Sequence, residues 1–424
     1  MKSSIKKKGA QKRETLFSGK VHCASTLTLE NGTSFLKQKI PNDGLLGITA
    51  KINLDLSFFS IYISRLTSRY SFISLQIIKF ANLKRPLFCM KISNYLFVAL
   101  LLVLLMFSCG KSEESCEWDQ AVLNTQIDFS FERLEESFFT AQSPEDFFFL
   151  MEKYPEFTNT YLQRDLYLSE DSLVADLIQI HQDSTMKDLF QSVKTEFPDL
   201  DSIENDLRNA FKSIKYHYPE FKVPKVYTFV SGFNSDLVIN EDMIVIGLDY
   251  FLPADHKYQP ELPKYMAERY DKNHLVAMIV TALSSRFNTI NPEDNTLLAE
   301  MIYYGKAYHF TKAILPCTPE KWIIGYTEGE LVDSYSNEEF IWSHFIENEL
   351  LYETNPFEIR KYLGEAPFTD AISTKAPGRL GRWLGWNIVD DYQVNENVSL
   401  IELMGEADAA KIFKLSGYRP RGLE

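Results

Sequence analysis

Residues 226–246 of this 424-residue chain read VYTFVSGFNSDLVINEDMIVI, and they mark a change in the sequence pattern. The first five residues are β-branched or aromatic, which is typical of a strand. The apolar runs 237–239 and 243–246 flank Asn240, Glu241 and Asp242, residue types that turns and short loops prefer. We therefore predict a strand followed by a hairpin, and hence a small antiparallel sheet in the middle of the chain.

Helical patterns surround these strands. Residues 127 to about 218 carry apolar side chains at three-to-four spacing, with Ser143 as a cap before Pro144. The amphipathic runs before the strands are 172–181, 186–197 and 200–218. The helices predicted after the strands are 272–287, 295–315, 338–351, 383–392 and 406–415, with a loop at 364–378. The expected fold class is α+β, mainly helical, with the small antiparallel sheet followed by helices.

A small sheet followed by a helix is also the order found in zinc peptidases, where the helix carries His-Glu-x-x-His. The two histidines bind the metal and the glutamate activates water. Here His274 is present, but Leu275 stands at the position of the glutamate and Met278 at that of the second histidine. Tyr304, on the next helix, lies where a third ligand would be expected. We interpret His274, Met278 and Tyr304 as a possible degenerate site in a zincin-like domain, and we expect no catalytic residue, metal or cofactor.

Residues 377–386, PGRLGRWLGW, combine glycine, arginine and tryptophan at unusual spacing. The glycines do not fit the dinucleotide-binding fingerprint, and the segment does not follow a predicted strand. On a helix, Gly381 and Gly385 would form a strip where a second element comes close. The arginines could bind a carboxylate or phosphate, or pair with nearby acids, and we expect packing to be the main role of the segment. The possible interaction residues are Arg379, Arg382, Trp383 and Trp386.

A different pattern occupies residues 90–111, MKISNYLFVALLLVLLMFSCGK. A short basic start, an apolar run over 95–107 and then Ser108 and Cys109 are the layout of a secretory signal. A Cys directly after a small residue resembles the processing site of bacterial lipoproteins. We predict a signal peptide at 90–108 and lipidation of Cys109, which becomes the new N-terminus. The alternative is a transmembrane helix, but the apolar run is shorter than the about 20 residues that a span needs.

The chain is expected to divide at this signal. Residues 1–89 hold 15 basic and 4 acidic residues, whereas residues 90–424 hold 29 basic and 54 acidic ones. Because a signal peptide acts near the N-terminus, we expect translation to begin at Met90 and residues 1–89 to be a spurious or disordered extension. Residues 109–120 would then be a lipidated tether and 121–424 the globular domain. Its expected parts are a helical part at 121–219 and a zincin-like part at 220–424.

Charge and cysteine content limit the partners. The acidic excess of residues 90–424 argues against nucleic acid and against an electrostatic grip on anionic lipid, so membrane contact is expected through the acyl chains. The cysteines are Cys23, Cys89, Cys109, Cys116 and Cys317. A disulfide could join the last two, but Cys116 lies in the tether. We therefore expect two free thiols.

Several short motifs occur in order between about 225 and 420. They are GLDYFL at 247–252, MIYYGKAY at 301–308, LP at 315–316, GYT at 325–327, NE at 337–338, IW at 341–342, LLY at 350–352, APGR at 376–379 and GWNIV at 385–389. Together with the lipoprotein signal, they resemble the gliding-motility-associated lipoprotein B family of Bacteroidota. The resemblance does not reach residues 1–89 and is thin over 120–220.

This resemblance implies a lipid-anchored envelope protein, associated with the outer membrane, that supports gliding in bacteria with type nine secretion. The family is also distantly similar to zinc-peptidase domains that have lost their ligands, and it implies no catalytic residue. Our prediction is a non-enzymatic protein that binds other gliding-machinery or envelope proteins, on the periplasmic or the surface face. The alternative is a metal-dependent hydrolase of peptide or cell-wall substrates, with a site near His274, Glu300 and Tyr304.

Overall fold

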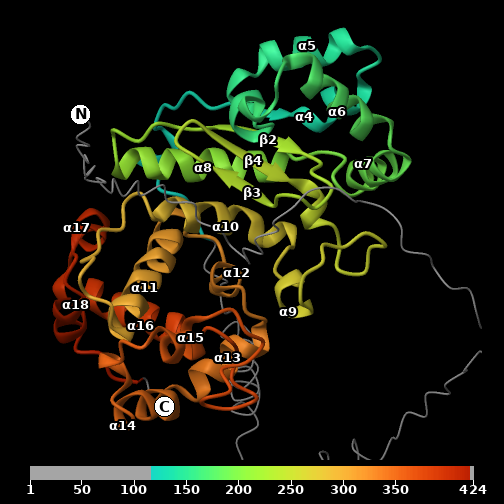
Figure 1. Cartoon of the computed structure of the whole chain (residues 1–424). Helices are drawn as coiled ribbons and strands as arrows, with labels where there is room; N and C mark the ends of the chain where they lie inside the picture. The colour runs from blue at the N-terminus through green and yellow to red at the C-terminus, as the bar shows by residue number, and fades with distance from the viewer. Residues whose placement is uncertain (1–115, 421–424) are drawn as a thin grey trace, which may run out of the picture. The chain divides into compact units, whose positions relative to one another are not determined.

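A mixed sheet of four strands separates two groups of helices in the computed structural model, which describes residues 116–420 (Figure 1). The strands are β1 (Phe131–Arg133), β2 (Lys225–Phe229), β3 (Leu237–Ile239) and β4 (Met243–Gly247), in the spatial order β1-β2-β4-β3. Strands β1 and β4 run parallel to β2, whereas β3 and β4 form an antiparallel hairpin. The predicted hairpin is confirmed, but the prediction of an antiparallel sheet is wrong.

Burial explains the strand order. Every residue of β4 is buried, whereas the residues of β3 are half-buried. A strand that is apolar on both faces is best placed between two neighbours, as in parallel sheets. The chain therefore skips one position after β2, forms β3 at the edge and returns as β4 parallel to β2. Strand β1 was predicted as helix, because the apolar spacing around Phe131 fits a helix and its pairing with Val226 is not local.

The described residues, 116–420, belong to one compact unit. The predictions of an extension at 1–89, a signal peptide at 90–108 and a lipid on Cys109 concern residues outside the described range. Within residues 116–420, no helix has both the length and the hydropathy that crossing a bilayer requires.

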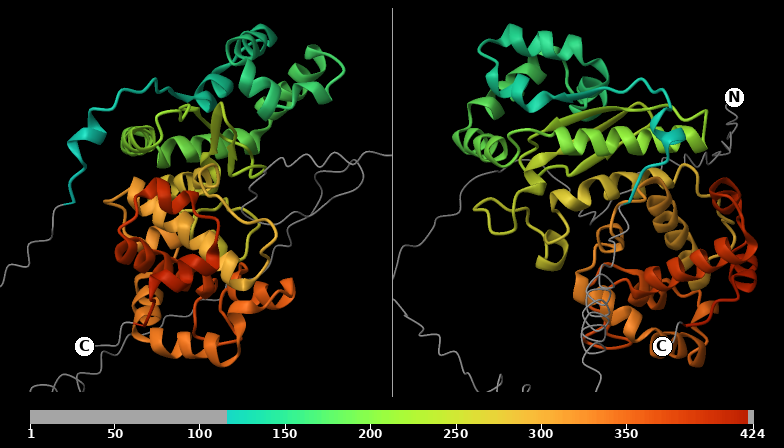
Figure 2. Two further views of the ribbon diagram at one scale, coloured as in Figure 1. Left: turned by 90° about the vertical axis from the view of Figure 1, so that its left-hand side faces the viewer. Right: turned by 180° about the vertical axis from the view of Figure 1, so that it is seen from behind.

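Each face of the sheet has its own hydrophobic core, because alternate residues of a strand point to opposite faces. The smaller core takes Tyr227, Phe229, Met243 and Val245 from the strands, and the larger core takes Val226, Ile244 and Ile246. Figure 2 shows from two further sides that the N-terminal helices and the C-terminal helices lie on opposite sides of the sheet. The sheet is thus the middle layer of three.

The smaller core lies under the N-terminal helices. They are α4 (Leu134–Thr140), α5 (Pro144–Lys153), the π-helical turn η2 (Phe157–Tyr161), the 3-10 turn η3 (Arg164–Leu166) and α6 (Glu170–Gln182). Helix α5 begins at Pro144, as predicted, and the Ser143 N–H donates a hydrogen bond of 2.9 Å to the Asp146 carboxylate. On α4, the buried Glu135 accepts a hydrogen bond of 2.6 Å from the Thr228 hydroxyl, which fastens this layer to the sheet.

The larger core lies on the other face and extends through the C-terminal helices. The longer helices are α7 (Ser184–Glu196), α8 (Asp201–His217), α10 (Lys272–Ser284), α11 (Leu297–Ile314), α14 (Glu338–Glu347), α16 (Leu380–Glu396) and α18 (Ala409–Ser416). Each of them is confirmed at a predicted position, with ends shifted by a few residues.

Shorter elements connect the helices of the larger core. They are α3 (Gln120–Leu123), η4 (Leu248–Phe251), α9 (Lys264–Ala267), α12 (Glu320–Ile324), α13 (Glu328–Ser336), η5 (Leu350–Tyr352), α15 (Pro356–Leu363) and α17 (Leu400–Gly405). None of these was predicted as a separate element, and η5 was taken as the end of the helix predicted at 338–351. One or two turns hold too few residues to show a period.

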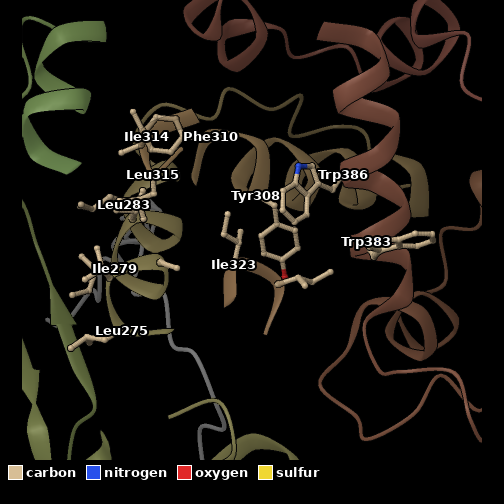
Figure 3. Close-up of a cluster of buried hydrophobic side chains, with 14 of the residues drawn as sticks. Leu275, Ile279, Leu283, Tyr308, Phe310, Ile314, Leu315, Ile323, Trp383 and Trp386 are labelled. Carbon is tan, nitrogen blue, oxygen red and sulfur yellow. The ribbon is translucent and has the colours of Figure 1, made fainter. Parts of the chain in front are cut away.

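Helices α11 and α16 meet at two glycines. A Cβ atom on Gly305 would lie 2.3 Å from the carbonyl oxygen of Gly385, and one on Gly385 would lie 2.0 Å from that of Met301. Only glycine lets the two backbones come this close. Figure 3 shows Tyr308 of α11 beside Trp386 of α16, with ring centroids 5.5 Å apart. The close approach predicted from the glycine spacing is present at Gly385.

The disulfide prediction is wrong. Cys116 and Cys317 are joined, with Cα atoms 5.3 Å apart, although they stand 201 positions apart in the sequence. Residues 116–120, the described end of the predicted tether, lead into a segment that is fixed to the body of the protein, since the Lys212 ammonium on α8 donates a hydrogen bond of 2.6 Å to the Leu123 carbonyl at the end of α3. Trp118 also packs against the larger core. Together these contacts bring Cys116 to the turn that follows α11.

We expect Gly385→Ala to lower the free energy of unfolding by about 3 kcal/mol or to prevent folding, because the added methyl group overlaps the α11 backbone. Urea unfolding followed by circular dichroism measures the change. The matched control is Gly329→Ala on α13, where no atom lies within 4 Å of the new methyl group. This control should raise stability by about 0.5–1 kcal/mol, and equal effects of the two substitutions would contradict the proposed crossing.

Loss of the Cys116–Cys317 disulfide should lower the free energy of unfolding by up to about 5 kcal/mol, because it frees a very long loop in the unfolded chain. Thermal unfolding with and without a reductant measures this effect, and a Cys116→Ser/Cys317→Ser double variant should not respond to the reductant. Peptide mass spectrometry without reduction should find the two cysteine peptides joined. Alkylation of both thiols in the unreduced protein would show that the bond is not formed.

Candidate functional site

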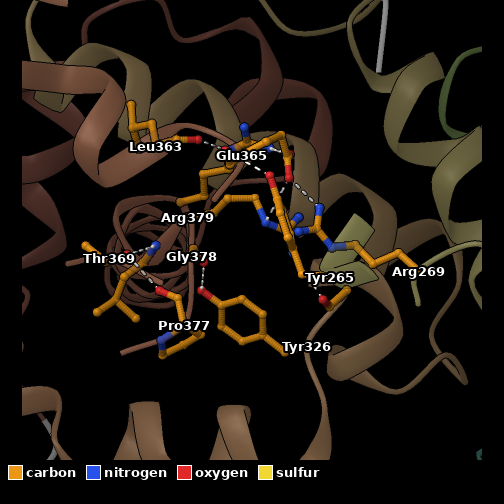
Figure 4. A network of polar contacts seen from close by, with 12 residues as sticks. Tyr265, Arg269, Tyr326, Leu363, Glu365, Thr369, Pro377, Gly378 and Arg379 are labelled. Atoms are coloured by element: carbon orange, nitrogen blue, oxygen red, sulfur yellow. Dashed lines mark hydrogen bonds and ion pairs between the residues drawn. The ribbon is translucent and has the colours of Figure 1, made fainter. Parts of the chain in front are cut away.

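Three arginines converge on the carboxylate of Glu365 (Figure 4). Arg269 Nη1 donates a hydrogen bond to Glu365 Oε2, and Arg379 Nε lies 3.7 Å from the same oxygen. Arg382 Nη1 lies 3.3 Å from Oε1. The three arginine side chains are largely buried and Glu365 is about two-thirds buried. We call these four residues the arginine cluster, in which one negative charge faces three positive charges.

The loop between α15 and α16 positions two members of the cluster. The buried Thr369 hydroxyl donates a hydrogen bond of 2.7 Å to the Pro377 carbonyl and so closes the loop on itself. At Gly378, a Cβ atom would lie 1.9 Å from the carbonyl oxygen of Ala366, so glycine is required for the two loop segments to touch. Arg379 follows with φ of 63°, a left-handed conformation that is uncommon for a residue with a side chain. This turn directs the chain into α16.

A cavity of about 260 Å³ opens beside the cluster, and we call it the arginine cavity. The residues that define its chemistry are Arg269, His274, Lys321, Trp322, Tyr326 and Arg379. The Tyr326 hydroxyl donates a hydrogen bond of 2.7 Å to the Gly378 carbonyl, and Arg379 Nη2 donates one of 3.1 Å to the Gly325 carbonyl. These bonds connect the turn before α13 to the loop before α16. They therefore fix the relative position of two segments that line the cavity.

The cations shift the titration of neighbouring groups. Burial opposes ionisation of Glu365, but the three guanidinium groups outweigh burial and lower the pKa of its carboxyl group. Burial is also the largest effect on His274 and lowers its pKa, and the arginines and lysine of the cavity lower it further against the opposing charge of Asp271. His274 is therefore neutral at neutral pH, and the cavity has a positive potential at this wall.

The structure places the three residues of the predicted degenerate metal site in three different environments. His274 lines the arginine cavity, while Met278 lies one turn later on α10 and packs against the larger core. Tyr304 and Glu300 line a second cavity of about 360 Å³. Within residues 116–420, no group of three or more histidine, cysteine or acidic side chains is arranged to hold a metal ion. His274 and Glu300 therefore face different cavities.

The second cavity contains a buried lysine. Lys306 is 1% exposed, and burial lowers its pKa to about 8. Its ammonium group donates hydrogen bonds of 2.9 Å to the Thr289 carbonyl and 2.7 Å to the Glu406 carbonyl. These bonds tie α11 to the loop after α10 and to the segment between α17 and α18. They give Lys306 a structural role.

The four predicted interaction residues have two different environments. Arg379 and Arg382 belong to the arginine cluster, and the Arg382 guanidinium also lies 4.1 Å from the centre of the Tyr304 ring. Trp383 and Trp386 are 1% and 4% exposed. In Figure 3 the Trp383 ring points away from Tyr308, and its T-shaped neighbour is Tyr335, at 5.2 Å. Both tryptophans therefore belong to the core and present no surface to a partner.

The sequence pattern revealed only half of the arginine cluster. Arg379 and Arg382 were noticed because they stand in an unusual segment, but Arg269 and Glu365 were missed. Arg269 lies 96 residues before Glu365, and no periodic pattern links the two positions. The only available indication was that the loop before Pro-Gly-Arg contains two acids, Glu365 and Asp370, and the sequence does not say which of them meets the arginines.

A family model described as Gliding motility protein GldB matches residues 115–420. The chain belongs to the GldB family. The protein is therefore a gliding motility protein, from a family not known for enzymes, and the predicted family is confirmed. The match includes the N-terminal helices, where the resemblance of motifs was thin. No curated protein and no solved structure matches the chain, so the zincin-like resemblance has no structural match to support it.

Glu365→Gln should lower the free energy of unfolding by about 3 kcal/mol, because three largely buried guanidinium groups lose their shared negative charge. Urea unfolding at neutral pH measures the effect. The matched control is Glu358→Gln, which removes an exposed ion pair with Lys361 and should cost less than about 1 kcal/mol. Equal losses in the two variants would show that Glu365 does not neutralise the cluster.

Proposed function

We propose that this GldB protein is a lipid-anchored component of the cell envelope that supports gliding by binding partner proteins and not by catalysis. Its family supports the role in motility. The apolar run at 95–107, followed by Ser108 and Cys109, supports export and acylation. On this proposal, acyl chains on Cys109 hold the protein at the outer membrane, and its partners are other proteins of the gliding machinery or envelope.

The observation that carries this proposal is the Cys116–Cys317 disulfide. Cys116 follows Cys109 by seven residues, and seven residues span at most about 25 Å when fully extended. The disulfide joins the end of this segment covalently to the turn after α11. With a lipid on Cys109, the folded unit would therefore stay within about 25 Å of the bilayer surface. Its partners would have to lie at the membrane or reach down to it.

The disulfide and the charge also support export and acylation. Disulfides persist in oxidising compartments such as the periplasm and the cell surface, and they are rare in the cytosol. Residues 90–424 hold 54 acidic and 29 basic residues, so anionic lipid would repel the folded unit. Attachment would then depend on the acyl chains of Cys109.

We do not propose a hydrolase. A peptidase reaction needs a metal or nucleophile beside a base, and His274 lies in a different cavity from Glu300 and Tyr304. The acids around the arginine cavity already have partners: Glu328 pairs with Lys321 at 3.1 Å, and Glu330 accepts the Thr327 N–H at 2.8 Å. His274 is therefore not placed to act together with Glu300 and Tyr304, as the predicted hydrolase site would require.

Cys109→Ala should move the protein out of the membrane fraction and abolish gliding, because the acyl chains are the proposed attachment. Cell fractionation, gliding assays and crosslinking in intact cells, each compared with a Ser112→Ala control, test this. The control should remain in the membrane fraction and crosslink to envelope or motility proteins. Continued tight membrane association of Cys109→Ala would overturn the anchor, and a control with no envelope or motility partner would overturn the proposed mode of action.

A further inference from the structure

The arginine cluster carries more positive charge than its own acid neutralises. Among residues 116–420, Glu365 is the only acid that forms an ion pair with Arg269, Arg379 or Arg382. Glu300 acts on Arg382 only at longer range. Charges removed from water need compensating partners, and an unpaired one is costly. The cluster therefore has an excess of positive charge that a further anion would stabilise.

The excess charge is accessible from the arginine cavity. Arg382 points its guanidinium to the Tyr304 ring and donates a hydrogen bond of 2.7 Å to the Leu363 carbonyl. Arg269 and Arg379 instead line the cavity, together with Lys321, whose ammonium group also pairs with Glu328 at 3.1 Å and has further N–H donors left. Arg379 is only 6% exposed. A ligand in the cavity would thus meet guanidinium groups that are shielded from bulk water. A charge-assisted hydrogen bond is stronger in such a shielded site than in water.

One buried polar atom on a residue of this cavity also lacks any partner among residues 116–420. It is His274 Nδ1; Arg379 Nε makes no hydrogen bond either, but it faces Glu365 Oε2 at 3.7 Å. An unpaired buried donor costs free energy that a ligand with acceptor oxygens would recover. Because His274 is neutral, it can donate one hydrogen bond from Nδ1 without adding to the positive charge. The charge excess and the unpaired imidazole nitrogen therefore indicate the same kind of ligand.

We propose that the arginine cavity is a binding site for a carboxylate group, held by Arg379 and Lys321 with His274 as a further donor. A carboxylate is planar, as the guanidinium group is, and the two form parallel hydrogen bonds. A carboxylate carries a single negative charge, whereas phosphate carries nearly two at neutral pH. Glu268, Glu328 and Glu330 also line the cavity, so they repel phosphate more strongly. Tyr265 and Trp322 provide aromatic walls for the rest of the ligand.

The experiment uses N-acetylphenylalanine, its amide and inorganic phosphate, each titrated into the full protein by calorimetry at millimolar concentrations. The free acid should bind. The amide and phosphate should bind at least about tenfold more weakly, because the amide lacks the negative charge of the carboxylate and because Glu268, Glu328 and Glu330 repel phosphate. Equal binding of acid and amide, phosphate binding as tight as that of the acid, or no binding of the acid would overturn the proposal.

A second titration identifies the source of the carboxylate. An N-acetylated hexapeptide with a C-terminal phenylalanine carries the same terminal group as N-acetylphenylalanine. Tighter binding of the hexapeptide assigns the site to the chain end of a partner protein, whereas tighter binding of the single acid assigns it to a small free acid. Both results support a carboxylate site, and failure of both ligands to bind overturns it.

Variants place the binding in this cavity. Arg379→Lys and Lys321→Ala should each weaken binding of N-acetylphenylalanine by about 10-fold or more, because each removes a charge-assisted hydrogen bond. Lys321 is one-third exposed, so its variant remains informative if the buried Arg379→Lys does not fold. Lys361→Ala, an exposed lysine on α15, is the control and should leave affinity unchanged. Unchanged affinity in a folded Lys321→Ala variant would overturn the proposed site.

The carboxylate site does not depend on the proposed anchor. A soluble Cys109→Ala variant should bind N-acetylphenylalanine as tightly as the unchanged protein, since it keeps Arg379, Lys321 and His274. If Lys321→Ala loses ligand binding but stays in the membrane fraction, the result supports the carboxylate site and leaves the proposed anchor unaffected.

Discussion

The close crossing of α11 and α16 is the constraint on which the rest of the C-terminal part depends. Gly305 and Gly385 allow carbonyl groups to approach where any side chain would overlap them. Eleven of the 18 residues of α11 are buried, and they include Lys306. Because the start of α16 is held against α11, Arg379 and Arg382 are brought to the same place as Glu365. The arginine cluster is thus a consequence of helix packing.

The sheet has a corresponding role in the N-terminal part. Its two inner strands are apolar on both faces, so they require a layer of helices on each side. The N-terminal helices and the C-terminal helices therefore share one sheet and form a single unit, although each has its own core. The Cys116–Cys317 disulfide adds a covalent link from the start of this unit to the turn after α11. That link also fixes how far the folded unit could lie from a lipid on Cys109.

Charge is distributed unevenly in this GldB protein. The chain has 58 acidic and 44 basic residues, yet three arginines share one carboxylate beside a cavity. Burying them is unfavourable unless they contribute to packing, to ligand binding or to both. Packing accounts for Arg382, which lies over the Tyr304 ring. Ligand binding is the role we propose for Arg379, whose guanidinium lines the cavity.

The sequence by itself determined the family, the mainly helical fold class, the long helices and the β3–β4 hairpin. These features follow from short-range patterns: apolar spacing within a helix, turn residues between two strands and motifs in a particular order. Only the tertiary structure decided that β4 lies between β2 and β3, that Cys116 bonds to Cys317, and that Arg269 meets Glu365. It also decided that His274 and Tyr304 face different cavities. Residues 96 or 201 positions apart meet only where the chain path brings them together, and local periodicity does not encode that path.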